Sequence, residues 1–187
     1  GPLAGPGNYQ ARLTVGGETF VEPFTVVPDP RLEATVEDFD AQTALGLKIR
    51  DTHGELNTAV NRIRALREQA KGWVARAKDG ESGAAIAAAA KQLGDKLDAI
   101  EGELLQVKAQ SMQDTLNYPV KLNTKLASLG WALQMSDSAP TKQMFDLYDN
   151  LAERIGEQLK ALAAVVETDV PAFNAAVQKA KVPAVAG

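Results

Sequence analysis

A heptad-spaced row of apolar and small side chains is the feature that most restricts how this chain can fold. The row begins at residue 45, alternates steps of four and three residues, and persists for about five heptads. Its members are Leu45, Ile49, Thr52, Leu56, Ala59, Ile63, Leu66, Ala70, Trp73 and Ala77. Such a repeat is typical of long helices that pack side by side. It predicts a helix from about Thr35, which pairs with Asp38 in a capping box, to about Gly80.

The same spacing recurs in two later stretches and predicts further long helices. Residues 83–136 carry Ile86, Ala90, Leu93, Leu97, Ile100, Leu104 and Val107, and then, one residue out of phase, Leu122, Leu126, Leu129 and Leu133. Residues 140–180 carry Met144, Tyr148, Leu151, Ile155, Leu159, Leu162, Val166, Val170, Phe173 and Val177. Ser138 is the expected N-cap of the last helix, and Pro171 predicts a bend near residues 167–171.

Pro119 decides how many helices the bundle contains, because proline removes a backbone donor and clashes with the preceding turn. If Pro119 only kinks residues 83–136, three long antiparallel helices result. If it breaks them, a four-helix arrangement with a short third helix results. We favour three helices, since unequal helices leave one end of the first uncovered. The predicted fold class is mainly α, a long antiparallel helical bundle preceded by a β-hairpin.

The hairpin is predicted from residues 8–27, "NYQARLTVGGETFVEPFTVV". Apolar and polar residues alternate in the first half, and Gly16 and Gly17 supply a tight turn. Pro23 cannot donate to a ladder, which predicts an open or irregular edge. A lone hairpin is marginal in water, so it either lies on the helices or belongs to a β-sandwich whose other strands are missing. We predict that residues 1–31 are the remnant of a truncated sandwich and residues 32–187 the helical domain.

Composition argues against several classes of function. The net charge is −4, from 20 basic and 24 acidic residues whose signs are interleaved, whereas nucleic-acid binders carry a basic excess or stripe. The lack of cysteine excludes disulfides and thiolate metal sites. No stretch reaches the roughly 18–20 apolar residues that cross a bilayer. We therefore expect no nucleic-acid partner and no membrane span.

The sequence predicts no catalytic residue, metal site or cofactor. His53 is the lone histidine; Asp51 and Glu55 do not share a helix face with it, which argues against a metal site, and we expect His53 to be a surface residue. The G-x-S-x-G elbow of a serine hydrolase is absent. Two carboxylate pairs have the spacing of an exposed helix face: Asp146 with Asp149, and Glu101 with Glu103.

Three aromatic residues could contact a sugar or a partner protein. Trp73 lies on the heptad row of its predicted helix, so we expect it to pack in the core. Trp131 falls off the leucine row of its helix, and Tyr118 lies where the pattern is blurred. Trp131 and Tyr118 are therefore the candidate partner contacts.

Two segments are similar to one known family. Residues 1–31, with the run "PGNY…RLTV…TV…DPR", and residues 114–159, with "LNYP" and "KLNTKL", carry the similarity. They resemble the end of the β-domain and the helical tail of bacterial proteins built on a sortilin-like propeller of Asp-box repeats, often labelled glycosyl hydrolases. The Asp-box itself (Ser-x-Asp-x-Gly-x-x-x-Trp) is absent, so no functional residue of the family carries over. The resemblance implies a C-terminal accessory region, part of an immunoglobulin-like or fibronectin-like domain plus a bundle, in a periplasmic or secreted protein.

Two functions are consistent with these features. The first is a non-catalytic structural or protein-interaction module of a larger exported propeller protein, because no polar cluster interrupts the heptad rows. Its partners are the upstream β-propeller and β-sandwich domains of the same protein, or another protein chain. The alternative is an accessory part of a glycan-acting hydrolase whose catalytic domain lies upstream.

The lone hairpin yields a first prediction. Amide hydrogens of residues 8–27 should exchange faster than those of the helix cores, because few contacts protect two isolated strands. Hydrogen exchange followed by NMR measures this directly. Protection equal to that of the helix cores, in a monomer, would mean that the helices cover the strands.

Overall fold

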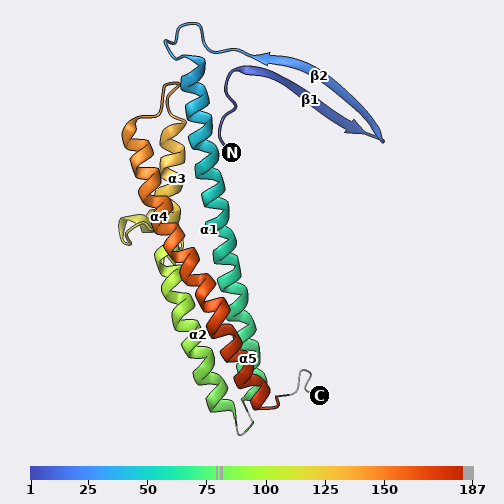
Figure 1. The fold of residues 1–187 in the computed structure, drawn as a ribbon, viewed down its shortest axis with the longest axis vertical. Helices are drawn as coiled ribbons and strands as arrows, with labels where there is room; N and C mark the ends of the chain where they lie inside the picture. The colour runs from blue at the N-terminus through green and yellow to red at the C-terminus, as the bar shows by residue number, and fades with distance from the viewer. Residues whose placement is uncertain (79, 81, 183–187) are drawn as a thin grey trace. The chain divides into compact units, whose positions relative to one another are not determined.

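The computed structural model describes residues 1–78, 80 and 82–182 (Figure 1). A hairpin of β1 (Gly7–Val15) and β2 (Glu18–Val26) precedes the helices α1 (Val36–Ala77), α2 (Gly83–Leu104), α3 (Leu122–Leu133), α4 (Lys142–Ala164) and α5 (Val170–Lys179). A 3-10 turn, Met112–Leu116, lies between α2 and α3, and a π-helical turn, Val165–Asp169, joins α4 to α5. The predicted class, a mainly helical bundle preceded by a hairpin, is confirmed.

The chain divides into two compact units. The first comprises residues 1–51 and 127–149, and it holds the hairpin, the start of α1, most of α3 and the start of α4. The second comprises residues 52–126 and 150–187, and it holds the rest of α1, all of α2 and α5, and the rest of α4. The boundary expected after residue 31 stays a prediction.

The predicted capping box sets the start of α1. The backbone N–H of Asp38 donates to Thr35 Oγ1 at 3.2 Å, and the N–H of Thr35 donates to Asp38 Oδ2 at 2.9 Å. These two bonds satisfy donors that the first turn of a helix leaves unpaired. The heptad row of the helix is buried as expected, except that Thr52, Leu66 and Trp73 are half-buried.

An aliphatic seam fills the interior of the second unit. Its most deeply buried side chains come from α1, α2, α4 and α3, and they are Leu56, Ile63, Ile86, Leu97, Leu104, Leu126, Leu151 and Ile155. Phe173 and Val177 of α5 are also buried, and α5 lies against α2 (Figure 1). Burying a side chain of this size contributes about 1.5–3 kcal/mol to folding. The seam is therefore the main source of stability in this unit.

The favoured three-helix arrangement is wrong, and the four-helix alternative with a short third helix is correct when α4 and α5, joined by the π-helical turn, are counted as one helix. α2 ends at Leu104, because Leu105 adopts an extended backbone with φ −127° and ψ 151°. Val107, expected on the seam, is exposed. The helix therefore ends well upstream of Pro119, where the apolar spacing fails, and Pro119 does not act as a kink.

Residues 105–121 form a closed loop between α2 and α3. Gln106 Nε2 donates to the carbonyl of Pro119 at 2.9 Å and so joins the two ends of the loop. Within the loop, Asp114 accepts the backbone N–H groups of Gln110 and Ser111 at 2.6 and 3.0 Å. These bonds lower the pKa of Asp114. Hydrogen bonds from polar side chains thus hold the loop in one conformation, in place of the backbone hydrogen bonds of a helix.

The bend expected near residues 167–171 coincides with the π-helical turn that joins α4 to α5. Val170 donates its N–H to the carbonyl of Val165, which adds one residue to the turn relative to an α-helix. Pro171, which follows, has no N–H to donate. Val165, where the turn begins, is buried and Val166, the position expected from the heptad row, is half-buried, whereas Phe173 and Val177 are buried as expected.

The predicted N-cap of α4 is wrong. The helix begins at Lys142, and Thr141 Oγ1 accepts the N–H of Met144 at 3.4 Å. Pro140 disfavours helical dihedrals in the residue before it, so a helix capped by Ser138 would meet this restriction in its first turn. Thr141 is the first suitable cap after the proline.

Replacing a seam leucine should destabilise the fold strongly. Leu97→Ala removes a side chain with no exposed surface, and we expect it to lower the free energy of unfolding by about 2–5 kcal/mol. Leu116→Ala is the matched control, since Leu116 is 86 % exposed, and we expect a change within about 0.5 kcal/mol. Urea denaturation followed by circular dichroism measures both, and equal losses would mean that the seam is not the stabilising element.

Candidate functional site

The hairpin is built around a two-residue turn. Gly16 and Gly17 have φ values of 60° and 89°, left-handed conformations that favour glycine and match a type I′ turn. This turn fixes the register, in which Val15 lies opposite Glu18 and Leu13 lies opposite Phe20. Such turns have the twist of the flanking strands, so the ladder continues to Gly7 without a break.

The register sorts the side chains of the hairpin into two different faces. Residues directly opposite each other in a ladder share a face, and successive residues alternate between faces. One face carries Tyr9, Ala11, Leu13, Val15, Phe20, Glu22, Phe24 and Val26, with Glu18 at its end. The other carries Asn8, Gln10, Arg12, Thr14, Thr19, Val21, Pro23 and Thr25. We name these sets the apolar face and the polar face.

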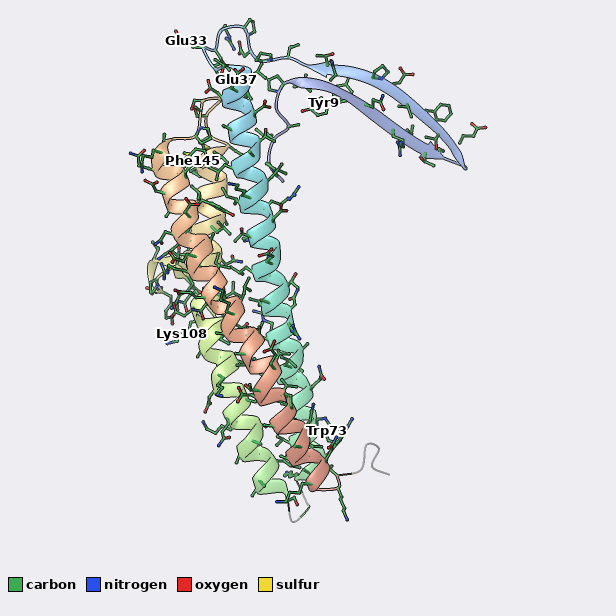
Figure 2. All side chains as sticks on the ribbon, in the orientation of Figure 1. Tyr9, Glu33, Glu37, Trp73, Lys108 and Phe145 are labelled. Carbon is green, nitrogen blue, oxygen red and sulfur yellow. The ribbon has the colours of Figure 1, made fainter. Side chains whose placement is uncertain are left out.

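The apolar face is largely exposed, and only Tyr9 and Val26, near its open end, are half-buried by described residues. Leu13, Val15, Phe20 and Phe24 are 60, 59, 54 and 49 % exposed. Tyr9 is half-buried, and its ring stacks on that of Phe24 with centroids 5.8 Å apart (Figure 2). Contiguous apolar patches of this kind mark interaction surfaces in soluble proteins. The apolar face is therefore the leading candidate for a functional surface.

A second noteworthy site, an ion cluster around one buried carboxylate, lies between α1 and α2 in the second unit. Glu101 is 3 % exposed. Arg64 Nε donates to its Oε1 at 2.8 Å, and Arg67 donates to its Oε2. Arg67 Nε also lies 3.2 Å from Asp98 Oδ1. Glu101 stands beside Ile100, the residue that the heptad row assigns to the core, so the ion cluster borders the row, whose members Leu97, Ile100 and Leu104 are all buried.

The charge state of Glu101 follows from two opposing effects. Burial raises its pKa, but the hydrogen bonds from Arg64 and Arg67 outweigh burial and hold the pKa below its ordinary value. Glu101 is therefore an anion at neutral pH and has no proton to donate. The arrangement suits a structural ion pair that fixes how α1 and α2 align.

The two predicted partner contacts lie in different units. Trp131, on α3 in the first unit, is 67 % exposed, and Met135, one turn later along the chain, is exposed as well. Tyr118 lies in the closed loop of the second unit, is 36 % exposed, and has Lys108 Nζ 5.9 Å from its ring centroid. Trp73 is half-buried under Arg76, whose guanidinium carbon is 4.9 Å from the ring centroid (Figure 2).

The remaining polar candidates are bound within the chain. His53 is half-buried rather than fully exposed; its Nδ1 lies 3.2 Å from Asn57 Nδ2, and its Nε2 is buried with no hydrogen-bond partner among the described residues. The carboxylates of Glu103 and Asp146 form ion pairs with Lys121 and Lys142 at 2.9 and 2.5 Å. Glu101 and Glu103 thus bind different partners and do not face a common site.

Two hollows are of note. A groove of about 480 Å³ between α1 and α2 is lined mainly by small residues such as Ala70, Ala87, Ala90 and Gly94. A smaller one, about 170 Å³, lies at the base of the hairpin and is lined in part by Asp29, Phe39 and Asp137. The pKa of Asp29 is lowered by its hydrogen bonds with Arg31, so Asp29 does not have the raised pKa of a general acid.

Searches with the whole chain give no relatives. No protein-family model, no curated protein and no solved structure matches it. Among the residues that the structure describes, no helix is long and apolar enough to span a bilayer. Within the same residues, no three histidine or acidic side chains come together as a metal site would need.

Removing the charge of Glu101 should weaken the fold in a pH-dependent way. We expect Glu101→Gln to lower the free energy of unfolding at pH 7 by about 1–3 kcal/mol, because a charged hydrogen-bond acceptor is lost. The folded-state pKa of Glu101 is depressed, so the wild-type advantage is complete above the unfolded pKa of about 4.3. It disappears as the pH falls through the folded-state pKa.

Urea denaturation between pH 7 and pH 2 measures this difference. Glu103→Gln is the control, because its partner pair with Lys121 is partly exposed and should contribute less than about 1 kcal/mol. A wild-type advantage over Glu101→Gln that does not change with pH would show that the ion cluster is not its source.

Proposed function

We propose that the chain is a non-catalytic structural and protein-interaction module that binds its partner through the apolar face of the hairpin. One observation carries this proposal. The helices bury their aliphatic rows, whereas the hairpin leaves Leu13, Phe20 and Phe24 about half exposed. Exposed apolar area costs about 25 cal/mol per Å², and a partner that covers it recovers this free energy.

The proposal extends to the setting of the module. The partner is a β-domain, either of the same polypeptide or of another chain, because a sheet face is best covered by a second sheet. Residues 1–31 and 114–159 resemble the C-terminal region of exported sortilin-like propeller proteins. On that basis the module serves in the periplasm or outside the cell, where it supports the propeller and sandwich domains.

The alternative is that the module assists a glycan-acting hydrolase. Its support in the structure is the hollow where Asp29, Asp137 and Phe39 meet, since carboxylates beside an aromatic wall are typical of sugar sites. Arg31 holds the pKa of Asp29 below its ordinary value, so Asp29 is an anion and the general acid of a hydrolase would have to be another residue. The apolar face is the stronger feature, and it favours the interaction module.

Site-specific photo-cross-linking tests the proposal. Benzoylphenylalanine replaces Phe20 on the apolar face or, as the matched control, Val21 on the polar face; the two side chains are 54 and 44 % exposed. In cells that produce the protein, the Phe20 position should cross-link to one contiguous segment of a β-domain, identified by mass spectrometry. The Val21 position should give at most about a tenth of that yield, because it faces away from the partner.

Two outcomes would contradict the proposal. Equal yields at both positions would mean that the hairpin touches its surroundings without preference, and no product from the Phe20 position would mean that the apolar face has no partner. Cross-linking to a glycan hydrolase whose activity falls when the chain is deleted would instead establish the alternative.

A further inference from the structure

We propose that the partner of the hairpin adds a β-strand to the outer edge of β1, and that the outer edge of β2 stays free. This inference rests on the proposed function and names how the partner binds. The occupant is an edge strand of a separate two-sheet β-domain: its own sheet continues the hairpin, and the facing sheet of that domain covers the apolar face.

The first step concerns which backbone groups point outward. In a hairpin with a type I′ turn, the residues that flank the turn, here Val15 and Glu18, form a hydrogen-bonded pair. Hydrogen-bonded and non-hydrogen-bonded pairs alternate along an antiparallel ladder. The outward-pointing N–H and C=O groups are therefore those of Asn8, Gln10, Arg12 and Thr14 on β1, and those of Thr19, Val21, Pro23 and Thr25 on β2.

The second step is that the two edges are unequal. Pro23 lies opposite Gln10 and has no N–H, so the outward edge of β2 lacks a donor in its middle. The outward edge of β1 has a donor at each alternate residue from Asn8 to Thr14. Proline on an edge is a known device against strand addition. An added strand therefore finds a complete ladder only on β1.

The third step excludes a stack of two hairpins as the stable complex. Each strand has nine residues, so the apolar face measures about 30 by 10 Å, or about 300 Å². A stable interface buries about 800 Å² on each partner. The hairpin face alone is too small, so the occupant must be a two-sheet β-domain that pairs one sheet with the β1 edge and covers the apolar face with the other.

Charge points to the same kind of occupant. The apolar face carries the carboxylates of Glu18 and Glu22 and no cation, whereas Arg12 lies on the polar face. A second copy would place like charges of the two apolar faces against each other. A covering sheet with lysine or arginine near its rim would pair with both carboxylates.

A strand peptide and two proline variants of the full chain test the proposal. The probe is a synthetic peptide with the sequence of residues 7–15; in an antiparallel pairing it places its Tyr9 opposite Leu13 of the protein, on the apolar side. At about ten times its dissociation constant, the peptide should slow amide exchange about tenfold at Asn8, Gln10, Arg12 and Thr14. NMR reads each amide separately.

The variants separate the two edges. Gln10→Pro removes one outward donor from β1 and should weaken peptide binding at least tenfold, whereas Val21→Pro, the matched change on β2, should leave it unchanged. Ala11 and Leu13 report whether the hairpin still forms in each variant. If Gln10→Pro disrupts the hairpin, two peptides N-methylated at alternate positions are tested on the wild-type chain instead. Methylation of the N–H groups that face β1 should abolish binding, whereas methylation of the N–H groups that face away from β1 should leave it unchanged.

Each remaining outcome decides against the proposal. Protection of Thr19, Val21 and Thr25 would place the strand on β2, and unchanged binding by Gln10→Pro would exclude edge addition. Concentration-dependent dimers of the chain without peptide, abolished by Gln10→Pro, would make the occupant a second copy. If these tests fail while Phe20 still cross-links to a partner, the proposed function stands and only the edge assignment falls.

Discussion

The aliphatic seam of the second unit is the interaction on which the rest of that unit depends. Leu56, Leu97 and Leu151 come from three different helices, and each is at most 1 % exposed. Interiors packed in this way have little room for water or for unpaired polar groups. The buried charge of Glu101 persists there because arginines on the facing helix supply donors for both of its oxygens.

The period of the seam made most of the helical fold predictable, and its interruptions explain the errors. Apolar spacing reports which side of a helix is buried, but it does not report whether the helix continues through a stretch where the spacing blurs. Residues 105–121 form such a stretch, and their order comes from polar bonds such as that between Gln106 and Pro119. Likewise, a count of threes and fours does not reveal the π-helical turn that begins at Val165, and it places Val166 in the core, where the structure buries Val165.

The ion cluster was missed for a different reason. Glu101 lies 37 residues from Arg64 and 34 from Arg67 in sequence, so no local pattern connects them. The spacing gave no signal either, since it assigns the neighbouring residue, Ile100, to the core between Leu97 and Leu104. Its burial, which only the structure shows, implies an opposite charge on the facing helix, because an unpaired buried carboxylate would cost several kcal/mol.

The hairpin shows the opposite case, in which local interactions give order without burial. The turn at Gly16 and Gly17, the contact between the hydroxyls of Thr14 and Thr19 at 3.3 Å, and the bond from Thr25 to Asn8 at 2.8 Å all act within the two strands. They order the backbone before a partner binds. The loss of conformational entropy on association is therefore smaller than for a disordered strand, for which ordering costs about 1–2 kcal/mol per residue. A fixed register also presents the apolar side chains in one arrangement. A partner can then discriminate by the side chains it offers opposite Leu13 and Phe20, since a one-residue slip would turn its own apolar set to the wrong face.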